Sequence, residues 1–474
     1  MPSKKVLSAR RKKALLEKKK TGAAREPVRD RAERDFLADV AKNATETVRG
    51  GMPWAAKTVW DWTPRGADDG KTGKLEAARR MKALLAAAGK LSLAELGAKA
   101  TWTNVDGVLH VTALVLRGPA FEGVLALAGI PFLADLEVSD TELRGLDISG
   151  NPVLAKLQLR DNLLDKLDVS DNASLIWLDV AGNALRSLDV AKNGGLTFLD
   201  AERNLLSELD LSKNPALAIL NVNMNHMDEL DVSKNAALAE LFASNNYLGG
   251  LDVSGNAELR LLDVAENALT ELDLSKNTKL AYLDVMENEL ETLDVSKNPA
   301  LIKLRLSENN LESLDVSGRA ALTDLVADNN RLAEIKVSGC AALRRLDVDE
   351  NLLTGLDLST NASLTGLDAS VNKLESLDVS GNPALESLSA GHNRLEKIDL
   401  SRNARLVYLE LEGNRLEELD VSKNVALILL DVSGNRLSRL DLAANQALAE
   451  VRAFGTTLTD SDISGYSGKA RFNS

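Results

Sequence analysis

The sequence is short of the residue types on which catalytic and metal sites depend. Its 474 residues include one cysteine, three histidines and 3% aromatic residues. A single cysteine excludes both an internal disulfide and a zinc site built from several cysteines. The histidines at positions 110, 226 and 392 are many residues apart, so no pair of them is expected to act together. We therefore expect no enzyme, no catalytic residue, no cofactor and no metal site.

Long apolar runs are also missing. No stretch of about eighteen consecutive apolar residues occurs, so no transmembrane segment is predicted. The basic N-terminus is not followed by the apolar segment that a secretory signal peptide needs. We expect a cytoplasmic protein by default, or one exported without a cleaved signal peptide.

The charge is distributed unevenly along the chain. Residues 1–100 carry 24 Lys and Arg against 12 Asp and Glu, a balance of +12. The remaining residues carry 33 Lys and Arg against 58 Asp and Glu, a balance of −25. The net charge of the whole chain is therefore −13. Such asymmetry predicts two surfaces with different partners, or two parts of the chain that attract each other.

A leucine returns every 21 residues without a shift in register. It occupies these positions, with isoleucine at two of them: Leu146, Leu167, Leu188, Leu209, Leu230, Leu251, Leu272, Leu293, Leu314, Ile335, Leu356, Leu377, Ile398, Leu419 and Leu440. A fixed period near twenty residues indicates a solenoid, in which each coil covers the next.

One unit shows what a coil contains. The pattern L-x-x-L-x-L-x-x-N-x-L is formed by Leu301, Leu304, Leu306, Asn309 and Leu311. This signature resembles leucine-rich repeats. The segment from Leu293 to Asn298 echoes the same pattern, and such nesting is similar to the 21-residue bacterial class called IRREKO. The resemblance covers roughly residues 105–460.

The fold class implied by this resemblance is α+β overall. We expect a right-handed parallel-β solenoid with two short-strand faces and low curvature, preceded by a small helical N-terminal region. The predicted segments are a basic tail at 1–22, the helical region at 23–101, a capping coil at 102–124, sixteen units of 21 residues at 125–460, and a C-terminal cap or tail at 461–474.

Two columns of asparagine and one of aspartate follow the same period. One asparagine column runs from Asn162 to Asn435, and the other from Asn151 to Asn445 with Arg319 and Cys340 as interruptions. Asparagine suits a tight corner, because its amide can pair with backbone donors and acceptors. We interpret both columns as scaffold, and Cys340 as a buried corner residue.

The aspartates recur from Asp147 to Asp441, with Lys336 as the single exception among fifteen units. Parallel stacking would bring these carboxylates about 5 Å apart, and mutual repulsion should then raise some of their pKa values. A row of carboxylates could bind Ca²⁺. The alternative is that the serine two residues further on, nearby lysines and water relieve the charge.

The two outward positions beside each L-x-L strand vary most between units, so we predict that they form the binding surface. Early units place aromatic and aliphatic side chains there, flanked by carboxylates, as expected of an interface. The predicted site residues are Trp177, Asp179, Phe198, Asp200, Ile219, Phe242, Leu261, Asp263, Tyr282, Asp284, Arg305, Arg345 and Tyr408.

We therefore expect non-enzymatic recognition of a protein, or of a glycan, by the variable strand positions. One alternative is a delivered bacterial effector or adhesin that binds a host or target protein. Another is nucleic-acid or anionic-membrane association through a basic tail. That tail contains Lys4, Lys5, Arg10, Arg11, Lys12, Lys13, Lys18, Lys19 and Lys20. No small-molecule substrate is expected.

Overall fold

The computed structural model describes residues 100–466 apart from 106–107, 118–121 and 128–129. The predicted basic tail lies outside these residues, as does the predicted helical region except for its last two residues, which begin a strand. The chain forms two compact units, one ending at Leu209 and the other beginning at Asp210. Each unit is described separately.

The first unit begins with an antiparallel pair of strands and continues as a parallel sheet. Strand β1 pairs antiparallel with β2, and β2, β4, β6, β7 and β8 then pair in parallel, one per coil. A separate pair, β3 and β5, lies in the other half of the first coils. The bounds are β1 (Ala100–Val105), β2 (Val108–Arg117), β3 (Glu122–Ala126), β4 (Asp135–Ser139), β5 (Glu142–Asp147), β6 (Lys156–Gln158), β7 (Trp177–Asp179) and β8 (Phe198–Asp200).

The second unit repeats the coil with a three-residue strand in each L-x-L segment. These strands are β9 (Ile219–Asn221), β10 (Glu240–Phe242), β11 (Leu261–Asp263), β12 (Tyr282–Asp284), β13 (Lys303–Arg305), β15 (Asp324–Val326), β17 (Arg345–Asp347), β18 (Gly366–Asp368), β19 (Ser387–Ser389), β20 (Tyr408–Glu410), β21 (Leu429–Asp431) and β23 (Glu450–Arg452). Each pairs in parallel with the next, at residues 21 positions apart. We call the outward side of these strands, and of β6–β8, the strand face.

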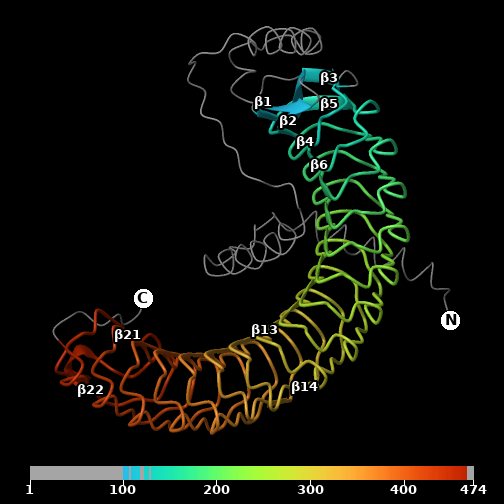
Figure 1. Cartoon of the computed structure of the whole chain (residues 1–474). Helices are drawn as coiled ribbons and strands as arrows, with labels where there is room; N and C mark the ends of the chain where they lie inside the picture. The colour runs from blue at the N-terminus through green and yellow to red at the C-terminus, as the bar shows by residue number, and fades with distance from the viewer. Residues whose placement is uncertain (1–99, 106–107, 118–121, 128–129, 467–474) are drawn as a thin grey trace. The chain divides into compact units, whose positions relative to one another are not determined.

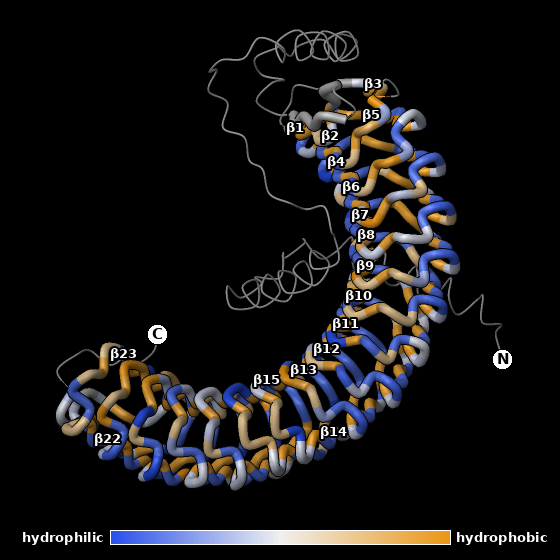
Figure 2. The backbone as a smooth tube through the Cα atoms, viewed as in Figure 1, coloured by the Kyte–Doolittle hydropathy of each residue, from blue (hydrophilic) through white to orange (hydrophobic). Residues whose placement is uncertain are grey.

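The core follows from alternation along each strand. The central leucine of a strand, such as Leu262 or Leu283, is buried, and its two neighbours project from the strand face. Hydrophobic segments recur along the solenoid for this reason (Figure 2). The 21-residue repeat predicted from the sequence is confirmed, and the chain forms a parallel solenoid.

The other half of each coil differs from the prediction of two short-strand faces. Among the described residues of the second unit, this half forms strands only in two pairs, and a short 3₁₀ helix follows the last full coil. These elements are β14 (Ser313–Asp315) with β16 (Glu334–Lys336), β22 (Leu440–Asp441) with β24 (Ile463–Ser464), and the 3₁₀ helix η2 (Asp460–Asp462). We call this side the opposite face.

The predicted low curvature is wrong for the second unit. Its coils follow an arc, with β13 on the inner side and β14 on the outer side (Figure 1). The strand face is a continuous ladder, which holds neighbouring strands about 4.8 Å apart. The opposite face lacks a continuous ladder, so its coils are free to spread apart and the stack bends around the strand face.

The first asparagine column uses both ends of its amide, as predicted. Asn267 donates through Nδ2 to the carbonyls of Ala243, Val264 and Ala265 at 2.9, 3.1 and 3.0 Å. Its Oδ1 accepts the N–H of Leu248 at 3.0 Å. The amide thus supplies partners to two successive coils at the corner that follows the strand.

The second asparagine column only donates. Asn277 gives two hydrogen bonds to the preceding coils, while its buried Oδ1 has no hydrogen-bond partner among the described residues. Where the column is interrupted, Arg319 donates to Val295 O at 2.7 Å and the thiol of Cys340 donates to Val316 O at 3.1 Å. Burial raises the pKa of Cys340, which keeps the thiol protonated. The interpretation of Cys340 as a buried corner residue is confirmed.

The corner before the first asparagine column requires a left-handed backbone. The sixteen residues at 21-residue intervals from Asp140 to Gly455 all have positive φ, and only four of them are glycine. Asparagine or aspartate at four of the other positions tolerates this conformation. Val371, with φ of 47°, does not, because its branched Cβ crowds the backbone.

Replacing Val371 by glycine is expected to stabilise the chain by about 0.5–1 kcal/mol, because the relief of backbone strain outweighs the added freedom of the unfolded chain. The side chain is 44% exposed, so little packing is lost. Urea unfolding measures the change. Gly434→Val is the reverse control and should destabilise. A Val371→Gly variant less stable than the parent chain would contradict the assignment of strain.

Candidate functional site on the strand face

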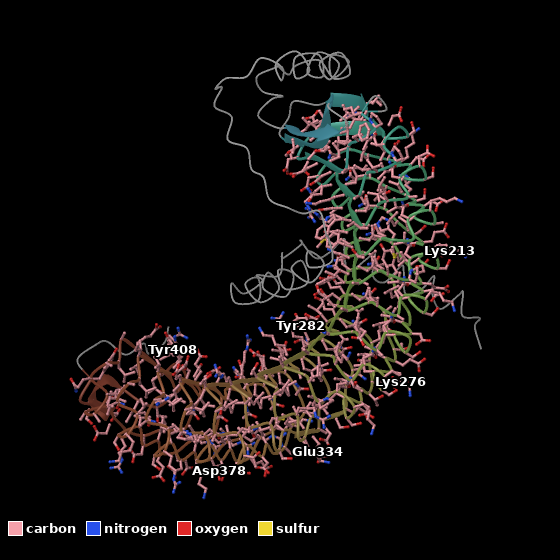
Figure 3. The ribbon with its side chains drawn as sticks, viewed as in Figure 1. Lys213, Lys276, Tyr282, Glu334, Asp378 and Tyr408 are labelled. Atoms are coloured by element: carbon pink, nitrogen blue, oxygen red, sulfur yellow. The ribbon has the colours of Figure 1, made fainter. Side chains whose placement is uncertain are left out.

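All thirteen predicted site residues lie on strands and project from the strand face. Parallel register places each beside its equivalent in the next coil, as with Leu261 beside Tyr282 and Asp263 beside Asp284. Tyr282 and Tyr408 lie on the inner side of the second unit, whereas Lys276, Glu334 and Asp378 lie on its outer side (Figure 3). The predicted residues therefore share one face within each unit.

In the first unit the face carries an aromatic stack. The rings of Trp177 and Phe198 are 3.7 Å apart between centroids and inclined by 7°. The Nζ atom of Lys156, in the same column of the preceding coil, lies 5.7 Å from the centre of the Trp177 ring. Stacking and the cation above it hold both rings in place, which lowers the entropy they would lose on binding a partner.

An ion-pair cluster flanks this stack. Arg160 pairs with Asp179 at 3.2 Å and also with Asp200 in the following coil. Burial, together with the charge of Asp179, raises the pKa of Asp200 to about 6, and Arg160 opposes this rise. Burial also raises the pKa of Asp179. Sequence reasoning missed Arg160, because it lies outside the two outward strand columns and reaches Asp200 from two coils away.

In the second unit, the first outward column of β9 to β12 holds buried side chains. Ile219, Glu240 and Leu261 are 7%, 5% and 1% exposed, although they occupy the outward column. Tyr282 is buried as well and donates a hydrogen bond to Asp284 Oδ2 at 3.2 Å. Burial raises the pKa of Glu240 to about 7, and Arg260 opposes this rise. Glu240 was not among the predicted residues.

The later strands present charged residues. Arg305 lies 3.8 Å from Asp284, and Arg345 is 3.1 Å from Asp347. Burial raises the pKa of Asp347, and the charges of Asp328 and Asp368 raise it further. Ion pairs between arginines and carboxylates therefore occupy the middle of the strand face.

Tyr408 is exposed, at 50%. Arg452, two strands away, lies within 4 Å of Glu410, Asp431 and Glu450. This part of the face therefore combines an exposed aromatic ring with a satisfied ion-pair network. Tyr408 lies well apart in sequence from the early predicted residues, in the last coils of the second unit.

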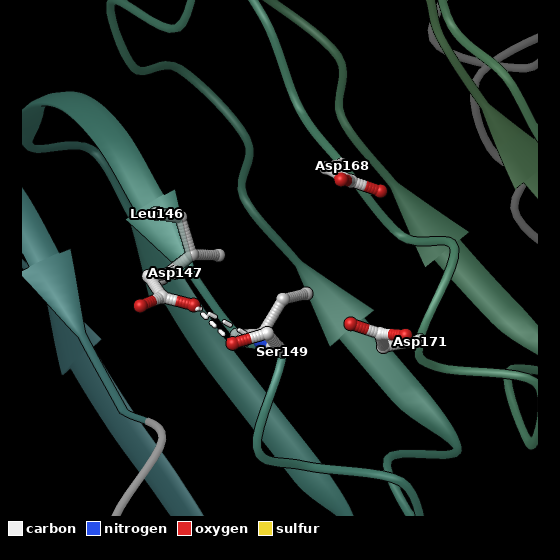
Figure 4. A pocket seen from close by; sticks show the side chains of 6 residues that line it. Leu146, Asp147, Ser149, Asp168 and Asp171 are labelled. Atoms are coloured by element: carbon white, nitrogen blue, oxygen red, sulfur yellow. Dashed lines mark hydrogen bonds between the residues drawn. The ribbon is translucent and has the colours of Figure 1, made fainter.

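The aspartate column belongs to the opposite face. Asp147 Oδ1 accepts hydrogen bonds from the N–H and hydroxyl of Ser149 at 3.1 and 2.7 Å, beside Asp168 and Asp171 in a shallow depression (Figure 4). These bonds lower the pKa of Asp147, and the same arrangement lowers that of most of the column.

The predicted rise in pKa from mutual repulsion along this column is therefore wrong. Local hydrogen bonds to the ionised form outweigh the repulsion between neighbouring coils. Among the described residues, no group of three or more histidine, cysteine or acidic side chains is arranged to hold a metal ion. In the same part of the chain, no helix is long and apolar enough to cross a membrane.

Parallel coils of 21 residues, with a leucine core, an asparagine column at each corner and a variable strand face, define a leucine-rich repeat protein. Comparison with solved structures gives the family. The functional domain of InlJ from Listeria monocytogenes, which includes a cysteine ladder, is 30% identical to this chain with a TM-score of 0.63. The match covers 74% of this chain and 76% of that one. The chain belongs to the leucine-rich repeat family.

Other structures agree. YopM from Yersinia enterocolitica is 28% identical over 77% of this chain and 80% of its own, with a TM-score of 0.60. The ectodomain of the plant receptor kinase GASSHO1 from Arabidopsis thaliana is 24% identical over 76% of this chain and 49% of its own, with a TM-score of 0.63, and shows the fold alone. No family model and no curated protein matches the chain.

Proposed function

We propose that the chain is a non-enzymatic recognition protein whose protein ligand binds the strand face. The observation that carries this proposal is the Trp177–Phe198 stack with its flanking Arg160–Asp179–Asp200 cluster. Rigid aromatic rings surrounded by ionic groups provide an apolar anchor and an orienting rim, which is the usual composition of a binding hot spot.

The solved relatives support a protein ligand at the level of the fold. The GASSHO1 ectodomain is in complex with Casparian strip integrity factor 2, and the plant peptide hormone receptor RGFR1 is in complex with RGF2. Among the described residues, the strand face carries no arrangement of nucleophile, base and oxyanion donors that would suggest catalysis. A protein ligand accounts for the mixture of aromatic and charged side chains better than a glycan does.

The proposal predicts that Trp177→Ala combined with Phe198→Ala weakens ligand binding at least about tenfold, because each aromatic anchor of a hot spot contributes more than ~1 kcal/mol. The full chain, immobilised, would capture ligands from a lysate, and each ligand would then be titrated against both forms. Leu352→Ala, which trims an exposed leucine outside the strand columns, is the matched control and should bind normally.

Equal retention of every ligand by the double variant would overturn the proposal. Loss of ligands from the Leu352→Ala control as well would also count against it, because the effect would then not be specific to the strand face. Circular dichroism on all three proteins shows whether the solenoid is intact.

A further inference from the structure

The later coils of the second unit carry a column of basic side chains outside the strand face. Lys373, Arg394, Arg415 and Arg436 recur at 21-residue intervals, and each directly follows an asparagine of the first asparagine column. We call these four residues the basic column. The three arginines are exposed, and Lys373 is half-buried. Among the described residues, none of the four forms an ion pair with an acidic side chain.

Hydrogen bonds between coils hold the basic column in register. The N–H of Arg394 donates to Leu374 O, and the N–H of Arg415 donates to Leu395 O, both at 2.9 Å. The N–H of Leu395 in turn donates to Asn414 Oδ1 at 3.0 Å. Because coils joined in this way lie about 4.8 Å apart, the basic side chains start from neighbouring points on a fixed backbone.

The stacking of the coils does not require basic residues at these positions. Like charges on adjacent strands destabilise a sheet, and the same repulsion acts between adjacent coils. Equivalent positions in earlier coils hold residues without a positive charge, namely Ala184, Ala268, Glu289 and Asn310. Those coils have the same asparagine corner, so the solenoid is built equally well without the four cations. An anionic partner would relieve their repulsion.

The width of the basic column selects the shape of such a partner. A parallel column of exposed glutamates lies two residues further along the same coils, at Glu375, Glu396 and Glu417. Two residues of chain span at most about 6.6 Å, so the positive strip is roughly one extended chain wide. A bilayer or a nucleic-acid duplex presents a broader negative surface, which would meet the glutamates as well. A single extended acidic peptide avoids them.

The other side of the basic column is open where the corner residue is glycine. Gly413 and Gly434 stand two residues before Arg415 and Arg436, with φ of 65° and 64°. Neither carries a side chain, and Gly434 is exposed, so the backbone of a ligand can approach this corner closely. The arginines beside it offer planar guanidinium groups, which bind carboxylates through two parallel hydrogen bonds.

We propose that the basic column binds an extended acidic segment of a protein partner, on a surface separate from the strand face. The segment runs along the stack of coils, and its carboxylates pair with the arginines. Alternate residues of an extended peptide are about 6.7 Å apart, and the long arginine side chains accommodate the difference from the coil spacing. The rest of the solenoid, which is acidic, would repel a long polyanion more than a short segment.

Peptide titration against the full chain tests this proposal. The probe is a fluorescein-labelled peptide of about ten residues with alternating glutamate and serine, long enough to span the four coils. Fluorescence anisotropy follows its binding to the parent chain and to a triple variant with Arg394→Ala, Arg415→Ala and Arg436→Ala. The segment Lys4–Lys20 is present in both proteins, so any binding by it is common to them.

A second triple variant provides the matched control. It removes the same charge from exposed positions in other columns of the same part of the chain, through Arg402→Ala, Arg405→Ala and Lys423→Ala. A peptide with lysine in place of glutamate controls for the charge of the probe.

We expect loss of the three arginines to weaken binding of the acidic peptide about tenfold, because three exposed charge-assisted contacts are lost together. The control variant should stay within about twofold of the parent chain, because screening limits the effect of charges outside the column. High salt should weaken binding by the parent chain for the same reason. Binding of the lysine peptide should not depend on the three arginines.

Three results would overturn the proposal. The first is equal weakening by both triple variants, because the peptide would then respond only to net charge. The second is a parent chain that does not bind the acidic peptide. The third is equally tight binding, through the same three arginines, of single-stranded oligothymidine or of vesicles that contain phosphatidylserine. That result would replace the protein segment with another polyanion as the ligand.

Folding and the proposed function are tested separately. Circular dichroism shows whether each triple variant retains the solenoid, and glutamine at the same three positions removes the charge while keeping most of the side chain. The Trp177→Ala and Phe198→Ala variant should bind the acidic peptide normally. A failure of recognition at the aromatic stack is therefore distinguished from a failure of the basic column.

Discussion

Replacing Asn277 by alanine is expected to lower the free energy of unfolding by about 2–4 kcal/mol, because two buried carbonyl oxygens lose their donor. Asn277 Nδ2 donates to Val253 O at 3.0 Å and to Asn256 O at 2.9 Å, and the side chain is completely buried. Water cannot replace these bonds without opening the corner. Urea unfolding of the variant and the parent chain measures the loss.

The natural interruption of the same column provides a graded control. Cys340 occupies an equivalent corner with one weak donor, its thiol, directed at Val316 O. Asn277→Cys should therefore be less damaging than Asn277→Ala, and Cys340→Asn should be neutral or stabilising. If the alanine variant were as stable as the parent chain, the corner amides would not be structural, and the column would need another explanation.

Replacing Glu240 by glutamine is expected to stabilise the chain by up to about 3 kcal/mol at pH 8, because the buried carboxylate is ionised there at a cost that the amide avoids. The pKa of Glu240 is raised from 4.5 to about 7 in the folded chain. Between these two values the folded state holds the extra proton, so the stability of the parent chain falls as the pH rises through this range. Below pH 4.5 the difference between the two proteins should vanish.

Urea unfolding of the parent chain and the Glu240→Gln variant across pH 4–8 measures this effect. Glu386→Gln, which changes an exposed glutamate directly before β19, is the matched control and should leave the pH profile unchanged. Parallel pH profiles for the parent chain and the Glu240→Gln variant would show that Glu240 is solvated in solution.

The repeat made much of the fold predictable. A strict 21-residue register assigns each residue to a column, so the buried leucines, the asparagine corners and the strand positions of Trp177 and Tyr282 follow from the sequence. The left-handed column could have been found as well, because glycine stands there at four positions. Val371 argued against a left-handed column in the sequence, because a β-branched residue rarely adopts that conformation.

Other features of the site were outside the reach of the sequence. The pairing of Arg160 with Asp200 depends on a side chain that crosses two coils, a distance that a column assignment does not specify. The aspartate column was predicted to repel itself, but the nearest hydroxyl and N–H groups decide its pKa values. Interactions that depend on the reach of one side chain do not repeat with the period.

The sequence by itself determined the coil, its register and which positions vary, because identical units must stack through identical contacts. Only the tertiary structure decided the bend of the second unit and the pairing of Arg160 with Asp200. The physical reason is that stacking is a local contact between neighbouring units. Curvature depends on differences between the two faces, and the pairing of Arg160 with Asp200 depends on the reach of one side chain.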